Sequence, residues 1–294
     1  MVHNGLRGHV QRYKCKDCGR RFDGGIRRDK SQVITDYIEG KQTCAQLAQK
    51  YGVSPRTIRR DLDNIKHKRK LAKYKHVTIL MDTTYWGRNF GLMVIKDATR
   101  NKIIWHKFVR HETIADYLEG VEWLERNGFK IYGIVIDGMR GLALALRRYP
   151  VQLCQFHQIQ IVRRYLTQEP DLEASRELLY LVKSIADMDK ESFIGAFNEW
   201  HERYGDVLDE RVHDKRLKGT PPYMRPRLRS AYLSLKRNMP LLWTFYDYKD
   251  RYIPNTNNAL EGTFSDIKTK LRVHSGIKKE MRKKIIEEYI SRHY

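Results

Sequence analysis

Two short apolar runs that each lead into an aspartate constrain the fold of this chain most strongly. Val77–Met81 precedes Asp82, and Ile131–Ile136 precedes Asp137. Runs of this length and β-branched content predict buried central strands. An unpaired carboxylate is costly to bury, so each Asp should lie where its strand opens into a crevice. For either Asp alone, capping of the following turn is the alternative, since Asp-Gly is a common turn dipeptide.

The two aspartates together are stronger evidence of a functional site than either one alone. If the two strands are neighbours, Asp82 and Asp137 meet at one edge of the sheet. Like charges at close range raise each other's pKa unless a cation lies between them. Carboxylate oxygens are the ligands that hard divalent cations prefer. We therefore favour a metal site at this edge.

The segments around these runs predict the fold class. Phe90–Lys96 and Lys102–Phe108 are further strands joined by a polar hairpin, and residues 114–127 form an amphipathic helix. A short strand, Val151–Cys154, follows the Asp137 run. Three antiparallel strands, a crossover helix and further parallel strands give an α/β fold with an RNase H-like mixed sheet. A right-handed crossover would place the Asp137 strand beside the Asp82 strand.

The long interval after these strands reads as helical. Apolar faces recur over about residues 165–250, which we interpret as an all-α insertion within a catalytic domain spanning 77–294. Its aromatic residues are expected mainly in the core, because large aromatics dominate buried area. The basic, proline-containing stretch 211–229 within it is expected to lie over DNA.

The charge of the chain indicates the class of partner. A formal charge of +22 over 294 residues points to a polyanion, and nucleic acid is favoured over a membrane surface. The sequence has no apolar run of about 18 residues and no signal-peptide pattern, so we expect no membrane partner. Its four cysteines are unevenly spaced, which argues against a disulfide framework. We expect a reduced, cytoplasmic protein.

Residues 31–66 carry the pattern of a helix-turn-helix domain. Thr43 and Ser54 are predicted N-caps, and Pro55 takes the first position of the last helix. That helix, Pro55–Ile65, would enter the major groove of double-stranded DNA. A packing unit that does not bind DNA is the alternative, and the basic face of the helix disfavours it. The predicted DNA-binding residues on this helix are Arg56, Thr57, Arg59 and Arg60.

Basic segments flank this domain. Residues 1–30 contain Cys15 and Cys18, a Cys-x-x-Cys knuckle typical of half a zinc ribbon. A structural Zn2+ takes four ligands, and neither His3 nor His9 has a convincing spacing, so zinc binding stays open. We expect a first knuckle to lie upstream in a longer reading frame. The linker 67–76 is expected to contact DNA phosphates through Lys68, Arg69 and Lys70.

Four motifs carry a resemblance to a known family. They are Met81-Asp82-Thr83-Thr84, Ile136-Asp137-Gly138-Met139-Arg140-Gly141, Cys154-Gln155-Phe156-His157 and Asn257-Asn258-Ala259-Leu260-Glu261-Gly262. With them, the chain resembles bacterial insertion-sequence transposases of the DDE type, in the branch related to the Mutator transposons. The resemblance covers most of the chain. The missing first zinc knuckle is the main departure.

The resemblance implies the catalytic residues. Asp82, Asp137 and Glu261 match the family's catalytic triad, and Cys154 with His157 matches the Cys-x-x-His of this branch. The triad would hold two Mg2+ or Mn2+ ions, with Asp82 bridging both. His157 would contact the scissile phosphate or order the site, and Cys154 is equally well explained as a buried strand-end residue. Without the resemblance, Glu261 would be only a helix-dipole glutamate.

Three functions follow from this interpretation. The first is a transposase that binds the ends of its element and cuts and joins DNA, acting as a homodimer or higher oligomer on element and target DNA. The second is a non-enzymatic, sequence-specific DNA-binding regulator derived from a transposase. The third is an RNase H-like nuclease without strand transfer. The intact triad favours an enzyme over the regulator.

Overall fold

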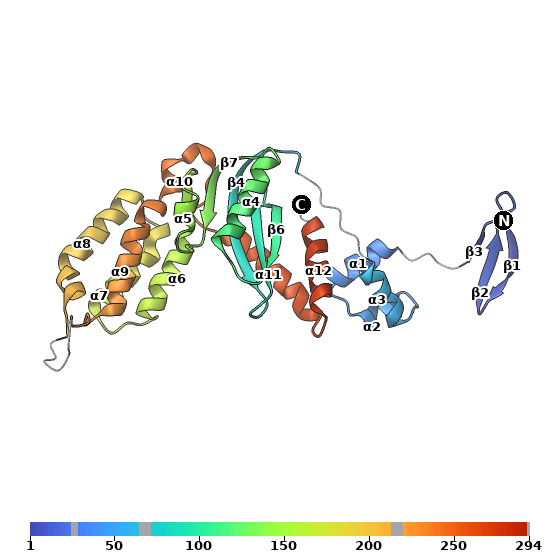
Figure 1. The fold of residues 1–294 in the computed structure, drawn as a ribbon. Coiled ribbons are helices and arrows are strands. Elements are labelled where there is room, and N and C mark those ends of the chain that lie inside the picture. Colours follow the sequence, from blue (N-terminus) through green and yellow to red (C-terminus); the bar gives the residue numbers. More distant parts are fainter. Residues whose placement is uncertain (25–28, 65–71, 213–219, 293–294) are drawn as a thin grey trace. The chain divides into compact units, whose positions relative to one another are not determined.

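The computed structural model (Figure 1) describes residues 1–24, 29–64, 72–212 and 220–292. The chain divides into two compact units. One unit comprises Met1–Lys68 with Ile267–Tyr289, and the other comprises Arg69–Asp266 with Ile290–Tyr294. The predicted contacts of Lys68, Arg69 and Lys70 lie outside the described residues. Among the helices of the described ranges, none has both the length and the apolar character needed to cross a bilayer.

The larger unit is built on a mixed five-stranded sheet with strand order β6-β5-β4-β7-β8. Its strands are β4 (His76–Tyr85), β5 (Gly91–Asp97), β6 (Lys102–Val109), β7 (Lys130–Ile136) and β8 (Val151–Leu153). β4, β5 and β6 pair antiparallel, whereas β7 is parallel to β4 and β8 is parallel to β7. The predicted meander and the adjacency of the Asp82 and Asp137 strands are therefore confirmed.

The central strands are buried, as their composition requires. All seven residues of β5 are buried, and β4 is buried from Val77 to Asp82. Strands covered on both faces read as continuous apolar runs, because neither face meets water. Helix α4 (Ile114–Arg126) contacts β6 and β7 and buries Tyr117, Val121 and Leu124. Thr113 caps this helix by accepting a hydrogen bond from the Asp116 backbone N–H.

Helices fill the described part of the chain between β8 and the last two helices. α6 (Gln155–Leu166), α7 (Glu173–Lys183), α8 (Lys190–Asp209) and α9 (Pro226–Asn238) pack as neighbours (Figure 1). The short helix α10 (Thr244–Asp247) and three 3-10 turns, Ser184–Ala186, Met239–Leu241 and Lys249–Arg251, complete the region, while the short helix α5 (Leu142–Ala145) lies between β7 and β8. Phe193, Phe197 and Trp200 are buried, so the expectation that these aromatics lie in the core is confirmed.

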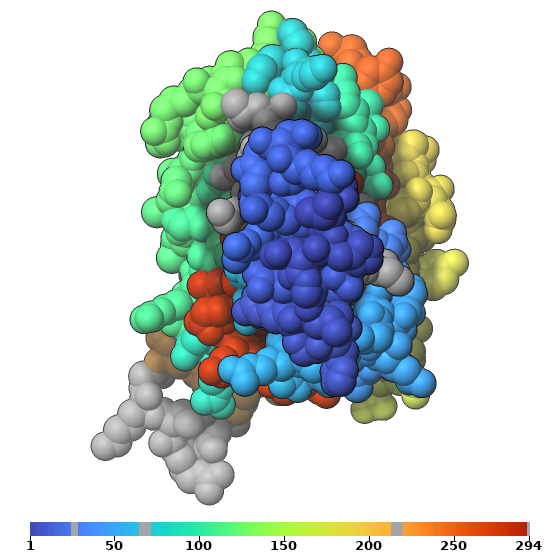
Figure 2. Space-filling view, turned by 90° about the vertical axis from the view of Figure 1, so that its right-hand side faces the viewer, coloured from blue at the N-terminus to red at the C-terminus, as the bar shows by residue number. Residues whose placement is uncertain are grey.

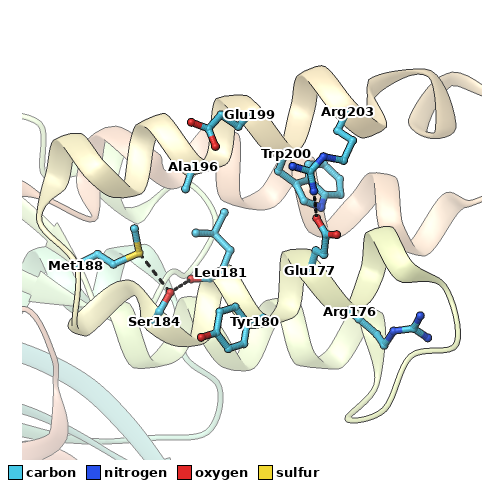
Figure 3. A pocket seen from close by; sticks show the side chains of 10 residues that line it. All are labelled: Arg176, Glu177, Tyr180, Leu181, Ser184, Met188, Ala196, Glu199, Trp200 and Arg203. Atoms are coloured by element: carbon cyan, nitrogen blue, oxygen red, sulfur yellow. Dashed lines mark hydrogen bonds and ion pairs between the residues drawn. The ribbon is translucent and has the colours of Figure 1, made fainter.

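An apolar groove lies between α7 and α8 (Figure 3). Its wall contains the Trp200 ring, and Arg203 pairs with Glu177 at one end. The Ser184 hydroxyl donates to the Leu181 carbonyl and to the Met188 sulfur at the other end. None of the predicted catalytic residues lines this groove, so it is a feature of the helical region alone.

The smaller unit contains a three-stranded antiparallel sheet and a set of helices. The sheet consists of β1 (Val2–Arg7), β2 (Val10–Lys14) and β3 (Arg21–Asp23), and its atoms form an elongated slab in space-filling view (Figure 2, dark blue). The helices are α1 (Lys30–Ile38), α2 (Cys44–Lys50) and α3 (Pro55–Asp63). Val33, Ile38, Leu47, Ile58 and Leu62 form their apolar core.

The last two helices supply the remainder of this unit. They are α11 (Asn258–Val273), which contributes to both units, and α12 (Lys279–Arg292). The His274 ring stacks on Tyr37, with ring centroids 3.9 Å apart, and Lys270 pairs with Glu39. Lys284 donates to the Asp63 carbonyl at the end of α3. Residues more than two hundred positions apart in the chain therefore stabilise the helices of the smaller unit.

Candidate functional site

Register places the two predicted aspartates level with each other. Leu80 pairs with Val135 in the parallel β4–β7 ladder, so Asp82 and Asp137 each lie two residues further along. β7 ends at Ile136, whereas β4 continues to Tyr85. Asp82 is therefore an interior residue of β4, and the expectation that it ends its strand is wrong. It lies level with Asp137, the residue that follows the end of the neighbouring parallel strand β7.

Asp82 is the most perturbed carboxyl group of this edge. Its residue is 9% exposed, and burial raises its pKa to about 8, with further increases from the charges of Asp137, Glu112 and Glu261. The Thr83 backbone N–H donates to its Oδ1 at 2.6 Å and opposes part of this shift. The four carboxylates of Asp82, Glu112, Asp137 and Glu261 therefore concentrate negative charge at this edge. A bound cation would neutralise that charge and relieve their mutual repulsion.

Glu112 was not singled out by the sequence. It lies just before α4, and the Tyr117 hydroxyl donates to its Oε1 at 2.9 Å. The same hydroxyl is 3.1 Å from the Thr83 Oγ1, which ties Glu112 to β4 beside Asp82. Burial raises the pKa of Glu112, and the charge of Asp137 adds to this shift. Glu112 precedes the N-cap of α4, and this local sequence does not indicate that its side chain lies beside Asp82.

Glu261 comes from the first turn of α11. Its Oε1 lies 3.7 Å from the Nε2 of His157, which is in the first turn of α6. The Nδ1 of His157 is buried and has no hydrogen-bond partner. The predicted residues Glu261 and His157 are thus brought together. Among the described residues, however, no three His, Cys, Asp or Glu side chains form a group close enough to hold one metal ion.

Asn257 links the segments that carry the predicted residues. This fully buried residue donates from its side-chain Nδ2 to the Met81 carbonyl at 3.2 Å. Its backbone N–H donates to the Cys154 Sγ at 3.2 Å, and its carbonyl accepts from the Glu261 N–H at 3.2 Å. Cys154 is buried with a raised pKa, so it serves here as a small neutral acceptor.

A buried lysine supports the same helix start. Lys96 of β5 is 3% exposed, and its Nζ donates to the Ala259 carbonyl at 2.9 Å and to the Thr263 Oγ1 at 2.5 Å. Burial lowers the pKa of Lys96 to about 8. These bonds hold the turn of α11 that contains Glu261. A lysine at the end of an otherwise apolar run was the only sequence signal of this role.

Helix α3 keeps its three arginines exposed to solvent. Arg56, Arg59 and Arg60 of α3 are exposed and, with Ser54, Thr57 and Asp63, line a surface cavity of about 470 Å3. Thr57 is half-buried, and its Oγ1 is 3.0 Å from the Ser54 Oγ. Ser54 accepts from the Thr57 N–H, as its predicted N-cap role requires. Thr57 therefore contributes to the cap, while the three arginines remain available.

Comparison with known proteins identifies this part of the chain. Residues 30–76 match the DeoR-like helix-turn-helix domain. The helices α1, α2 and α3 lie within this matched range. Among solved structures, the chain is similar to one described as the Drosophila P element transposase strand transfer complex, with 11% identity, 94% of each chain covered and a TM-score of 0.43. No curated protein matches the chain.

The Cys-x-x-Cys knuckle lies in the turn between β2 and β3. The Cys15 N–H donates to the Arg20 carbonyl at 2.9 Å, and the Gly19 N–H donates to the Cys15 carbonyl at 3.1 Å. The two thiols are free and supply half of a four-ligand zinc site. The Asp17 Oδ2 accepts from the Cys15 Sγ at 3.9 Å, but within the described ranges no three His, Cys, Asp or Glu side chains are placed to hold one metal ion, so the residues present do not complete a zinc site.

We expect the Asp82→Asn variant to be more stable than the native protein at neutral and alkaline pH. The unfolded carboxyl group ionises near its usual pKa, whereas the folded one does so at about 8. Folding therefore takes up a proton between these values, and native stability falls as pH rises from about 4 to 8. Asn cannot ionise, so the variant should gain about 2–5 kcal/mol by pH 8.

Thermal melts at pH 5, 6.5 and 8 in EDTA measure this gain. The exposed Asp171→Asn variant is the control and should follow the native protein at each pH. Added Mn2+ should raise the native melting temperature and leave Asp82→Asn unchanged, because a ligand stabilises only the state that binds it. A gap between native and Asp82→Asn that does not widen with pH would contradict the burial of an ionisable Asp82.

Proposed function

We propose that this chain is a DDE-type transposase of the Mutator-related, insertion-sequence branch, with an RNase H-like catalytic fold. The single observation that carries the proposal is the placement of Asp82 and Asp137 at the same level of two adjacent parallel strands. The pKa of Asp82 responds to the charges of both Asp137 and Glu261. The helix-turn-helix domain at residues 30–76 gives the same chain a DNA-binding part.

The sheet supports the fold assignment. Its order, β6-β5-β4-β7-β8, combines an antiparallel meander with two parallel strands added after a crossover helix. This is the arrangement expected of an RNase H-like sheet from the sequence. A helical region follows β8, and α11 then returns Glu261 to the carboxylate edge. The proposed catalytic residues thus come from two strands and one distant helix.

The donor chemistry of this edge fits Mg2+ or Mn2+. Asp82, Asp137 and Glu261 offer hard carboxylate oxygens, and their mutual repulsion favours a bound cation. These three side chains would hold two ions. When bound, the ions would activate the attacking water or 3′-hydroxyl and stabilise the leaving oxygen.

The protein's own residues would position this chemistry. Asn257 and Lys96 fix the first turn of α11 and hence the backbone of Glu261. His157 faces Glu261 through its Nε2 and would orient that carboxylate or donate to a phosphate oxygen. Glu112 adds a fourth negative charge that strengthens the attraction for a cation.

The test of this proposal is Mn2+-dependent nicking of DNA that carries the element ends. The native protein should nick at the ends with Mn2+ or Mg2+ and fail with EDTA or Ca2+ alone. The regulator derived from a transposase would bind the same DNA and leave it intact under every condition. One observation favours that alternative: no preassembled group of three metal ligands exists among the described residues.

A further inference from the structure

A second cavity is lined by the residues on either side of Asp137, Ile136 and Gly138. It has a volume of about 510 Å3 and lies among the loop after β7, α5, α6 and α9. Gly138 and Gly141 of this loop have φ angles of 111° and 86°, which only glycine adopts readily. A Cβ added to Gly138 would meet the Leu153 and Ile161 side chains, which also line the cavity. The cavity therefore adjoins the carboxylate edge in sequence and belongs to the same unit.

Three arginines give this cavity its charge. Arg140 comes from the loop after β7, Arg164 from α6 and Arg237 from α9. No Asp or Glu lines the cavity, and none of the three guanidinium groups makes a hydrogen bond or ion pair with another described residue. Unpaired guanidinium groups converging from three elements favour an anion, and their planar donor arrangement suits phosphate oxygens.

The remaining lining suits a base and a sugar. Tyr165 is 37% exposed beside Arg164, and its ring offers a face for stacking. Leu144, Ile161 and Leu241 supply apolar surface. Asn238 donates to the buried Gln158 at 2.7 Å, which fixes its amide at the cavity wall. A free inorganic anion would use only the arginines, whereas a nucleotide would use every part of this lining.

We propose that this cavity, which we call the arginine cavity, binds one unpaired nucleotide of a DNA strand. The guanidinium groups of Arg140, Arg164 and Arg237 contact its phosphates, and the base stacks on Tyr165. An unpaired nucleotide held here lies next to the loop of Asp137, so it fixes the register of the strand relative to the carboxylates. The proposal rests on the proposed function only in taking DNA as the ligand.

The test compares two duplexes of one sequence in EDTA, one fully paired and one with a single extrahelical thymidine. Anisotropy with the full chain should show about tenfold tighter binding of the second duplex. The triple variant Arg140→Gln, Arg164→Gln, Arg237→Gln should lose this preference. The charge-matched control Arg147→Gln, Lys183→Gln, Lys236→Gln removes three cations outside the cavity and should keep it.

Tyr165 variants separate stacking from charge. Tyr165→Ala should lose most of the preference and Tyr165→Phe should retain it, while thermal melts establish that each variant folds. A 5-iodouracil at the extrahelical position should cross-link to the peptide containing Tyr165. Because this binding test contains no metal and measures no nicking, its failure is distinguishable from failure of the nicking test.

Three outcomes would overturn the assignment. Equal affinity for the two duplexes excludes an unpaired nucleotide as the ligand. A preference that survives the triple variant places the contact elsewhere. Binding of free dTMP that depends on Arg140, Arg164 and Arg237, without a preference between the duplexes, would make this a site for a free nucleotide instead of a strand.

Discussion

Replacing any one of the three proposed catalytic carboxylates should abolish DNA nicking while leaving DNA binding intact. We expect Asp82→Asn, Asp137→Asn and Glu261→Gln each to lower the nicking rate by at least about 10²–10³-fold, because each removes a charge needed to hold a catalytic ion. Isosteric amides keep the shape of each side chain. The helix-turn-helix domain is unchanged in all three variants, so affinity for the element ends should stay within a few-fold of native.

The design of this comparison needs matched controls. Glu122→Gln and Asp171→Asn make the same chemical change at exposed positions and should nick at the native rate. Glu112→Gln tests the fourth carboxylate. It should raise the Mn2+ concentration needed for half-maximal nicking without abolishing nicking. Full activity in any of the three triad variants would remove that residue from the proposed catalytic set.

Loss of the arginines on α3 should have the second-largest effect, on DNA recognition. Arg56, Arg59 and Arg60 are exposed and line one surface cavity. Replacing a base-reading arginine by Ala should cost about 1–3 kcal/mol and relax sequence preference. A phosphate-contacting arginine should instead weaken binding to all duplexes alike and reduce the salt dependence.

Gel shifts on the element ends and on random duplex, at two salt concentrations, measure both effects. Lys41→Asn is the control, because it removes an exposed cation of the same unit that is not on α3, and Asn tolerates its φ of 52°. Unchanged affinity of the triple variant for both duplexes would exclude α3 as the recognition helix.

The central strands were predictable because their apolar, β-branched composition matches their burial in the sheet. Each run is apolar and β-branched, and each lies in the middle of a sheet that is covered on both faces. The position of Asp82 inside β4 was not predictable. Thr83, Thr84 and Tyr85 extend the strand because they pair with β5, and pairing partners cannot be read from one run.

The supporting residues of the site were hidden for a different reason. Asn257 contacts Met81, which is 176 positions away in the chain, and Lys96 contacts Ala259 at a separation of 163. Such contacts depend on the tertiary fold and leave no periodic pattern in the sequence. Glu261 itself was chosen through the family resemblance, since a glutamate in a first helical turn ordinarily serves the helix dipole.

Helix boundaries show where local signals suffice. Thr43 caps α2 as predicted, accepting a hydrogen bond from the Gln46 backbone N–H. α3 ends at Asp63, two residues earlier than expected, where Asn64 donates to the Arg60 carbonyl. The packing of His274 and Lys270 onto α1 links the two ends of the chain, which a local pattern does not predict.

Joining of DNA tests the central proposal most directly, because it separates a transposase from a nuclease that uses the same carboxylates. The measurement is incubation of native protein with a labelled duplex ending in the element's terminal repeat, an unlabelled target duplex and Mn2+, followed by denaturing electrophoresis. We predict a labelled product longer than the donor strand, which is absent with Asp82→Asn and with EDTA. Donor strands that are nicked but never lengthened would contradict strand transfer and leave a nuclease.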